Sequence, residues 1–277
     1  MIFEKEAFGS LLQIDTFQQN IPNDRIKLCF DTVSLFEQNY SRFIPDNYLN
    51  KFNRNWWGKL TDEFKYLIKL AQKVWEDTNG YFDITLLPVL ENNGYGIEKE
   101  NLKVITWMNF IYLDENLCKL HHWVQIDLGG IGKWYMIDVL FWLLDEYLDT
   151  FIINFGGDIR VKWSHIIWLE DPFDTTKIIG EVSIENISLC GSSGQKRKIK
   201  NGHHIINPKT KQSQSDKIAV FCSHEKTIYS DTYATALFAA PLDESIKILN
   251  KSPWLEALII ASNGNIFKSH GFKASLY

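Results

Sequence analysis

Apolar residues recur along the chain at two spacings, and the wider spacing predicts the helices. In residues 24–43 the apolar side chains fall three or four positions apart, which is typical of a helix with one buried face. The same spacing predicts a helix over residues 61–78, which Asn79-Gly80 can close. Two further apolar runs predict helices over residues 134–149 and 231–240.

Strands are predicted where apolar and polar residues alternate or where short apolar runs end in turn residues. Residues 124–128 alternate and run into Gly129-Gly130. Residues 151–155 form a second strand that also ends in a Gly-Gly pair. The other predicted strands are residues 11–17, 178–184, 219–223 and 258–262. This mixture indicates an α+β or mixed α/β architecture, and no Pro-, Gly- or Ser-rich linker marks a domain boundary.

Composition and charge exclude several classes of protein. Of the 277 residues, 45% are hydrophobic and 23% charged, as in ordinary globular proteins, and a net charge of −5 gives no electrostatic footprint for nucleic acid. No apolar stretch approaches the length of a membrane span. The four cysteines are far apart and form no C-x-x-C pair, so zinc and dithiol redox chemistry lack support. The first residues show neither a secretory signal nor a lipid-anchor cysteine, so a cytoplasmic location is expected unless a leader was removed.

Asp231 and Thr235 have the most informative spacing in the chain. If residues 231–240 are helical, this carboxylate and this hydroxyl lie on one face, one turn apart. Two hard oxygen ligands so placed suit Mg²⁺, which keeps sites open for phosphates and water. The same residues also fit an ordinary helix start, with the threonine bonding back to a helix carbonyl. Both interpretations stay open for this segment alone.

The two Gly-Gly pairs can each bring the backbone close to a ligand. Glycine permits a tight bend and a close approach, and after the first pair Lys133 stands near a helix start. Exposed amides, the helix dipole and a lysine make a candidate pyrophosphate cradle, with two ligand-free turns as the alternative. The basic run at residues 196–198 is either a solvated loop or a phosphate contact. Neither the dinucleotide motif G-x-G-x-x-G nor a Walker loop is present.

Further candidate groups each have a structural alternative. Asp158, after the second Gly-Gly pair, and Asp83 are ligand contacts or turn residues. Ser192-Ser193-Gly194 offers hydroxyls and amides to a phosphate, or is a flexible turn. His204, before the Asn207-Pro208 turn, can accept a proton near neutral pH, although a lone histidine is usually a hydrogen-bonded structural residue.

Taken together and in order, these segments resemble the FAD:protein FMN transferase family, once called thiamine-biosynthesis lipoproteins. Each matching stretch is modest alone, and their joint order over nearly the whole chain makes the resemblance specific. The stretches are Phe8-Gly9-Ser10, Ser41-Arg42-Phe43, Phe82-Asp83-Ile84-Thr85, Ile126-Asp127-Leu128-Gly129-Gly130-Ile131-Gly132-Lys133, Asn154-Phe155-Gly156-Gly157-Asp158, Ser192-Ser193-Gly194, His204-Ile205-Ile206-Asn207-Pro208-Lys209-Thr210 and Asp231-Thr232-Tyr233-Ala234-Thr235.

The resemblance implies a single flavin transferase domain over residues 1–277, as one unit or as two interlocked α+β lobes. The implied fold is α+β and T-fold-like, with mixed, largely antiparallel sheets and packed helices. The implied activity is Mg²⁺-dependent transfer of the FMN half of FAD to a Ser or Thr hydroxyl of an acceptor flavoprotein, which releases AMP. Positioning, neutralisation of phosphate charge and a base for the hydroxyl would assist this reaction.

Two other functions fit the same resemblance. In Mg²⁺-dependent hydrolysis of FAD to FMN and AMP, water would replace the protein hydroxyl at the same site. A non-catalytic FAD-binding module is the second alternative. Such a module would not need the set of Asp231, Thr235 and His204, so the presence of this set favours catalysis.

The resemblance also gives individual residues expected roles. Asp231, Thr235 and the backbone carbonyl of Gly132 would hold Mg²⁺, with Asp231 and His204 as the catalytic pair and His204 as the base. Lys133 would face the pyrophosphate. The expected FAD-binding residues are Phe8, Ser41, Arg42, Asp83, Gly129, Gly130, Lys133, Asp138, Gly157, Asp158, Ser193, Gly194, His204 and Ile205.

The chain departs from the family's usual pattern at several positions. Gly132 stands for alanine, which a carbonyl ligand tolerates, and Trp134 stands for the glycine after the lysine, where an indole can narrow the pocket or stack on the ligand. Asn207 stands for aspartate and removes a charge close to the candidate base, while Lys211 and Ser192 stand for glycine and threonine. The expected metal pair is intact, so activity with altered pocket detail is expected.

Overall fold

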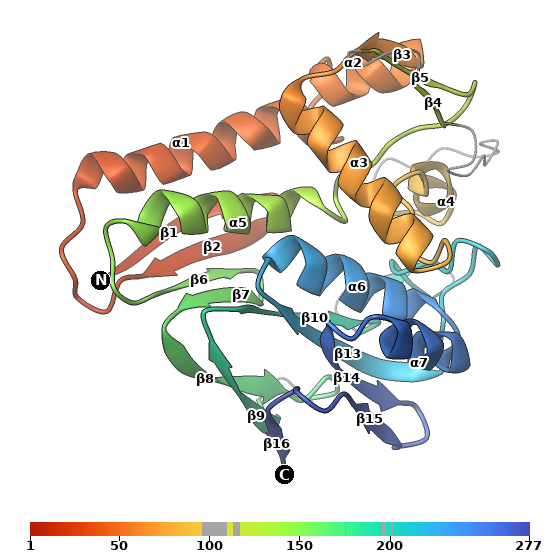
Figure 1. Ribbon diagram of the computed structural model, residues 1–277. Helices are drawn as coiled ribbons and strands as arrows, with labels where there is room; N and C mark the ends of the chain where they lie inside the picture. Colours follow the sequence, from red (N-terminus) through yellow and green to blue (C-terminus); the bar gives the residue numbers. More distant parts are fainter. Residues whose placement is uncertain (96–109, 113–116, 175, 196–197, 201) are drawn as a thin grey trace.

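Eight strands form the central sheet of the molecule (Figure 1). The computed structural model describes residues 1–95, 110–112, 117–174, 176–195, 198–200 and 202–277, so Lys196 and Arg197 of the basic run lie outside the described residues. Every pairing in this sheet is antiparallel, which confirms the predicted α+β class. In spatial order the strands are β1 (Ile2–Ala7), β2 (Ser10–Asp15), β6 (Phe151–Phe155), β7 (Asp158–Lys162), β10 (Ser188–Ser193), β13 (Lys217–His224), β14 (Glu256–Ala261) and β15 (Ile266–Lys268).

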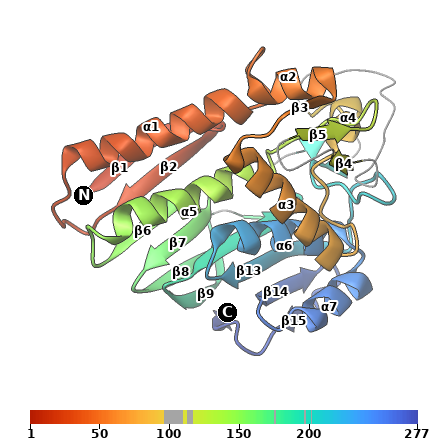
Figure 2. The ribbon, with the colours of Figure 1, turned by 45° about the horizontal axis from the view of Figure 1, so that its top comes forward.

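Helices cover one face of the sheet, and the main hydrophobic core lies beneath them (Figures 1 and 2). The three that lie along the sheet are α1 (Asn23–Tyr40), α5 (Gly132–Asp145) and α6 (Thr227–Ala239). The others are α2 (Tyr48–Asn55), α3 (Asp62–Asp77), α4 (Leu87–Asn92) and α7 (Leu242–Lys251). Among the described residues, no helix has the length and apolarity that a membrane crossing requires.

A smaller sheet packs against the opposite face of the central sheet. Its strands are β8 (Ser164–Glu170), β9 (Ile178–Glu185) and β16 (Ala274–Leu276). A second core, which includes Val161, Val182, Leu258 and Phe272, fills the space between the two layers. Two small sheets complete the described fold: β3 (Trp57–Lys59) with β5 (Leu117–Leu120) and β4 (Phe110–Tyr112), and β11 (Lys198–Ile199) with β12 (Gly202–His203).

Most predicted elements are present with small shifts at their ends. Residues 24–43 overlap α1, which begins one residue earlier and ends at Tyr40, and residues 61–78 contain α3. Residues 134–149 overlap α5, which begins earlier, at Gly132. The predicted strand at residues 151–155 is β6 with the same bounds. Local periodicity is therefore sufficient where the element buries one face against the main core.

The predicted strand at residues 124–128 is wrong, because these residues pair with no strand among the described residues. A buried side chain takes the place of a strand. The Nδ2 of Asn53 donates to the carbonyl of Ile126 at 2.8 Å, and its Oδ1 accepts the Ile126 N–H at 2.8 Å. The Asp127 N–H donates to the Ile84 carbonyl at 2.8 Å. Val124, Ile126 and Leu128 are therefore buried as in a strand, while the backbone partners of the segment come from outside any sheet.

The predicted start of the helix over residues 231–240 is also wrong, because this helix, α6, begins four residues earlier, at Thr227. Asp231 thus lies inside the helix and does not cap it. In the described part of the chain, Lys226 at the N-cap makes no side-chain capping bond. The carboxylate of Asp138 on α5 acts instead, accepting the N–H groups of Thr227 at 2.8 Å and Ile228 at 3.1 Å. A carboxylate from a neighbouring helix therefore both caps α6 and complements its dipole.

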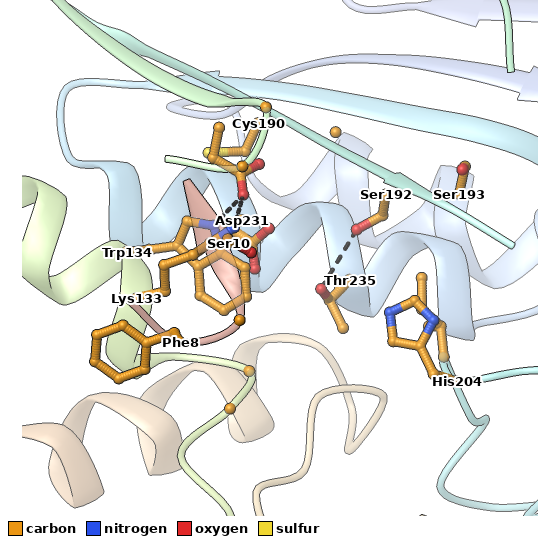
Figure 3. Close-up of a pocket in the computed structure, with 18 of the residues that line it drawn as sticks. Phe8, Ser10, Lys133, Trp134, Cys190, Ser192, Ser193, His204, Asp231 and Thr235 are labelled. Carbon is orange, nitrogen blue, oxygen red and sulfur yellow. Dashed lines mark hydrogen bonds and ion pairs between the residues drawn. The ribbon is translucent and has the colours of Figure 1, made fainter. Parts of the chain in front are cut away.

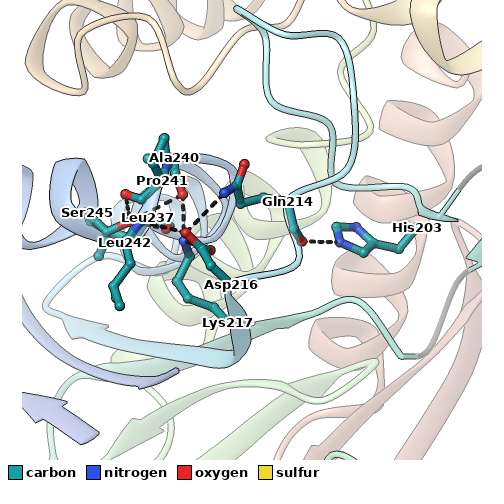
Figure 4. Close-up of polar contacts among 9 residues, drawn as sticks. All are labelled: His203, Gln214, Asp216, Lys217, Leu237, Ala240, Pro241, Leu242 and Ser245. Carbon is teal, nitrogen blue, oxygen red and sulfur yellow. Dashed lines mark hydrogen bonds and ion pairs between the residues drawn. The ribbon is translucent and has the colours of Figure 1, made fainter. Parts of the chain in front are cut away.

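A buried lysine holds the other end of α6 (Figure 4). The Nζ of Lys217 donates to the carbonyl of Ala240 at 2.5 Å and to Asp216 Oδ1 at 2.6 Å. Ser245 on α7 donates its hydroxyl to the Leu237 carbonyl at 2.6 Å. Charges of the sign that suits each helix end thus anchor α6 at both ends, which fixes the helix that carries the candidate metal ligands.

Candidate active site

A cavity of about 950 Å³ opens beside the start of α5, between β10, α6 and the turn from β6 to β7 (Figure 3). Its volume lies at the upper end of what small-molecule sites usually enclose. The segments that line it are spread along the chain from Phe8 to Thr235. The predicted site residues that line it are Phe8, Ser41, Arg42, Asp83, Gly129, Gly130, Lys133, Gly157, Asp158, Ser193, His204, Ile205, Asp231 and Thr235.

Asp231 and Thr235 lie one turn apart on the side of α6 that borders the cavity. Asp231 is buried, with only 2% of its surface exposed. The hydroxyl of Thr235 is 3.4 Å from the hydroxyl of Ser192 on β10. Carboxylate oxygens of Asp231 and Asp158 and the Sγ of Cys190 lie within 4.8 Å of one another. Carboxylate and hydroxyl oxygens thus meet at one wall of the cavity.

This set of donors fits a divalent cation. Hard oxygens from Asp231 and Thr235 match the preference of Mg²⁺, and the open cavity leaves room for phosphate and water ligands. The sulfur of Cys190 is a neutral thiol, because burial, and then the charges of Asp158 and Asp231, raise its pKa well above the ordinary value. The ligands that suit Mg²⁺ at this wall are therefore the oxygens of Asp231 and Thr235 and not the sulfur of Cys190.

Lys133 and Trp134 both donate to the same oxygen of Asp158. Lys133 Nζ is 2.5 Å and Trp134 Nε1 is 2.7 Å from Asp158 Oδ2. The turn from β6 to β7 approaches this group closely: Gly156 has φ +65°, and a Cβ there would lie 3.0 Å from Ser10 Oγ and 3.4 Å from Lys133 Nζ. The glycine is required both by its backbone conformation and by the lack of space. The ammonium group of Lys133 thus lies at the cavity wall, where it forms an ion pair with the carboxylate of Asp158.

The two adjacent histidines have different environments. His204 lines the same cavity as Thr235 (Figure 3), and its ring centroid is 5.7 Å from that of Tyr95. His203 points away: its Nε2 is 2.8 Å from the Gln214 carbonyl oxygen, and burial lowers its pKa. Of the two histidines, His204 is therefore the one placed to exchange a proton with a ligand.

Arg42 contributes a buried cation at another part of the wall. Its Nε is 3.8 Å from Asp127 Oδ2, and its guanidinium lies 4.6 Å from the ring centroid of Phe43 and 5.0 Å from that of Tyr95. Its Nη1 is buried and has no hydrogen-bond partner among the described residues. A ligand acceptor in the cavity can satisfy this donor, which would otherwise remain a destabilising orphan.

Phe8 and Asp83 line the cavity, and each makes a hydrogen bond that involves a backbone N–H group. Phe8 adopts φ 51°, and its N–H donates to Glu37 Oε1 at 2.6 Å. Asp83 accepts the N–H of Thr85 at 2.7 Å and its hydroxyl at 2.6 Å through Oδ1, which makes it a turn residue as well as a wall residue. The structure therefore shows Asp83 as a turn residue, and its contact with a ligand stays a prediction.

Three predicted site residues are missing from the described lining of the cavity: Asp138, Gly132 and Gly194. The structure places Asp138 beneath the site, where it pairs with Arg160 and caps α6. Asp138 thus has a structural role, and its expected contact with FAD stays a prediction. Gly132 is the buried first residue of α5. Gly194 packs so close to His203 that a Cβ would lie 2.5 Å from the imidazole Cδ2.

The sequence did not single out several residues that line the cavity. Cys190 precedes the predicted Ser192-Ser193-Gly194 turn, but its spacing from the other cysteines indicates no site. Asp127 lies in the segment whose alternation predicts a strand. Glu37 and Tyr95 carried no motif, because what brings them to the cavity is packing between distant segments.

Comparisons with known proteins agree on one family. The model of the ApbE family matches residues 8–259. The FAD:protein FMN transferase of Haemophilus influenzae is 28% identical, over 83% of this chain and 76% of that protein. The enzyme of the same name from Chlamydia trachomatis is 26% identical, over 83% of this chain and 79% of that protein.

Solved structures share the fold. The ApbE protein of Thermotoga maritima matches with a TM-score of 0.86 at 23% identity, covering 98% of this chain and 97% of that one. The flavin transferase ApbE of Vibrio cholerae matches with a TM-score of 0.83 at 17% identity, with the same coverage of both chains, 98% and 97%. At these identities the likeness concerns the fold.

Proposed function

The chain belongs to the ApbE family, and from this premise we propose that it is a Mg²⁺-dependent FAD:protein FMN transferase. Two relatives carry the name FAD:protein FMN transferase. The observation that carries the proposal is the pair Asp231 and Thr235 on the wall of a cavity that Lys133 and His204 also border. The substrates are FAD and an acceptor flavoprotein that offers a Ser or Thr hydroxyl.

The reaction forms one phosphoester bond and breaks one pyrophosphate bond. The acceptor oxygen bonds to the phosphorus of the FMN half, and the bridging oxygen leaves with AMP. Mg²⁺ held by Asp231 and Thr235 would neutralise phosphate charge. Lys133 adds a positive charge at the same wall, His204 accepts the proton of the attacking hydroxyl, and Arg42 offers Nη1 to a ligand acceptor.

The binding-module alternative is disfavoured by one observation. A site that only held FAD would need no buried carboxylate with a hydroxyl one helical turn away at the expected phosphate-binding wall, since a buried anion is costly unless it is compensated. Hydrolysis of FAD uses the same groups with water as the nucleophile. The acceptor hydroxyl is therefore the feature that an experiment has to vary.

The test is incubation of the chain with FAD, Mg²⁺ and an acceptor protein that carries a Ser or Thr in a Gly-Ala-Thr-like context. Mass spectrometry should show the acceptor gaining FMN, with AMP in equal amount. Asp231→Ala and His204→Ala should abolish the adduct, while Asp243→Asn, at an exposed carboxylate on α7, should not. AMP and free FMN without adduct would indicate a hydrolase. Bound, unchanged FAD with several acceptors would indicate a binding module.

A further inference from the structure

A thiol lies in the same buried cluster as two carboxylates of the candidate site. Cys190 on β10, Asp158 at the start of β7 and Asp231 on α6 place one ligand atom each within 4.8 Å of the others. Their exposed fractions are 0%, 5% and 2%. Ligands of one tetrahedral Zn²⁺-like ion lie about 2.0–2.3 Å from it, so two of them lie roughly 3.3–3.8 Å apart. Inward movements of these side chains by up to about 1 Å would let the three share an ion.

The cluster can be reached and has the charge that attracts a cation. All three residues line the cavity. Asp158 and Asp231 bring two negative charges, and Lys133 brings one positive charge, so the group retains an excess negative charge in a buried setting where Coulomb attraction is strong. Lys133 and Trp134 both donate to Asp158 Oδ2, so the ion would meet this carboxylate through Oδ1.

We propose that Cys190 turns this wall into a mixed oxygen–thiolate site that binds a thiophilic divalent cation of the Zn²⁺, Co²⁺ or Cd²⁺ class in competition with Mg²⁺. Soft and borderline ions favour thiolate, whereas Mg²⁺ favours oxygen. On binding, the S–H bond breaks, an S–metal bond forms, and the proton passes to solvent, with no change of oxidation state. The inference rests on the proposed metal pair for the position of the ion and adds a ligand and a second class of metal.

Titration of the full chain with Cd²⁺, without FAD or acceptor, tests the proposal. Ultraviolet absorbance from thiolate-to-Cd²⁺ charge transfer should rise to saturation at one ion per chain, with protons released in step. Cys190→Ser should remove the band and weaken Cd²⁺ binding by at least about tenfold. Cys222→Ser is the matched control, because Cys222 is the equally buried register partner of Cys190 across β10 and β13 and lies outside the cluster. This variant should keep the band.

A band that persists in Cys190→Ser, or that disappears equally in Cys222→Ser, would overturn the proposal. If Cys190→Ser does not fold, Asp231→Asn decides: Cd²⁺ affinity should fall, and unchanged affinity would overturn the shared site. Because the titration contains neither FAD nor acceptor, its outcome is separate from the transferase assay. A chain that binds Cd²⁺ here but transfers no FMN would refute only the proposed function, and the reverse pattern only this inference.

Discussion

The carboxylate of Asp138 accepts the backbone N–H of Thr227, the first residue of α6, at 2.8 Å. It also forms a buried ion pair with Arg160 of β7. α5 begins beside the cavity, β7 begins with Asp158, and α6 carries Asp231. The Asp138 carboxylate thus links α5, β7 and α6, the three elements that border the candidate metal site. Asp138 itself does not line the cavity in the described structure.

Replacing Asp138 with alanine should destabilise the fold strongly. Arg160 is 4% exposed and would keep its charge in the interior without its ion-pair partner. Removing one member of a buried pair costs about 3–5 kcal/mol. Urea unfolding measures the loss. Asp145→Asn on the same helix is the control, because its pair with Lys162 is partly exposed and is worth no more than about 1 kcal/mol. Equal losses in both variants would contradict the assigned role.

Two histidines should make stability depend on pH. His203 Nδ1 accepts the Ile205 N–H at 3.3 Å while its Nε2 faces the Gln214 carbonyl, a pattern that only the neutral ring can satisfy. His224 Nδ1 accepts the Lys226 N–H at 2.9 Å. Burial lowers the pKa of both rings from 6.5. The folded chain therefore binds fewer protons than the unfolded chain once the pH is below this value.

The free energy of unfolding should consequently be unaffected by these groups well above pH 6.5 and should fall as the pH drops through 6.5 toward the folded pKa. Urea unfolding at a series of pH values measures this slope. His203→Gln should flatten it, whereas His121→Gln, at an exposed position, should leave it unchanged. The same slope in wild type and His203→Gln would rule out the assignment.

Local sequence patterns predicted the elements that turn one face to the main core and the other to solvent. α3 follows from its apolar spacing and from Thr61, whose hydroxyl accepts the Phe64 N–H at 3.0 Å. Residues 124–128 carry the alternation of a strand, but their backbone partner is the side chain of Asn53, 73 residues from Ile126. A partner so distant in the chain leaves no periodic signal near the segment it satisfies.

The candidate site was predictable where its functional groups lie close together in the sequence. Asp231 and Thr235 follow from a four-residue spacing, but the first residue of α6 depends on Asp138, which is 89 residues from Thr227. Cys190 illustrates the converse. Its position among carboxylates depends on three separate elements packing together, so its chain neighbours do not indicate it.

Gly132 and Phe36 should prove energetically coupled. A Cβ at Gly132 would lie 2.8 Å from Phe36 Cε1 and 3.2 Å from its Cζ, and Phe36 is 3% exposed. Gly132→Ala should therefore destabilise the chain by about 1–3 kcal/mol through overpacking. In the background of Phe36→Leu the same substitution should cost less. A double-mutant cycle of urea unfolding measures the coupling, and strict additivity would show that the ring does not fill the space of the methyl group.

Substitutions at Thr235 separate metal binding from packing. Thr235→Val keeps the shape but removes the hydroxyl, whereas Thr235→Ser keeps the hydroxyl and removes a methyl group. Losing a group that merely orients a metal ligand weakens binding by about 10–100-fold, so losing a ligand should raise the Mg²⁺ concentration needed for half-maximal effect at least tenfold. Thermal stabilisation by Mg²⁺ in the presence of FAD gives this concentration without relying on turnover. Ser192→Ala controls for the 3.4 Å contact between the two hydroxyls and should respond to Mg²⁺ as the wild type does. If Thr235→Val and Thr235→Ser respond alike, the hydroxyl is not a ligand and α6 contributes Asp231 alone.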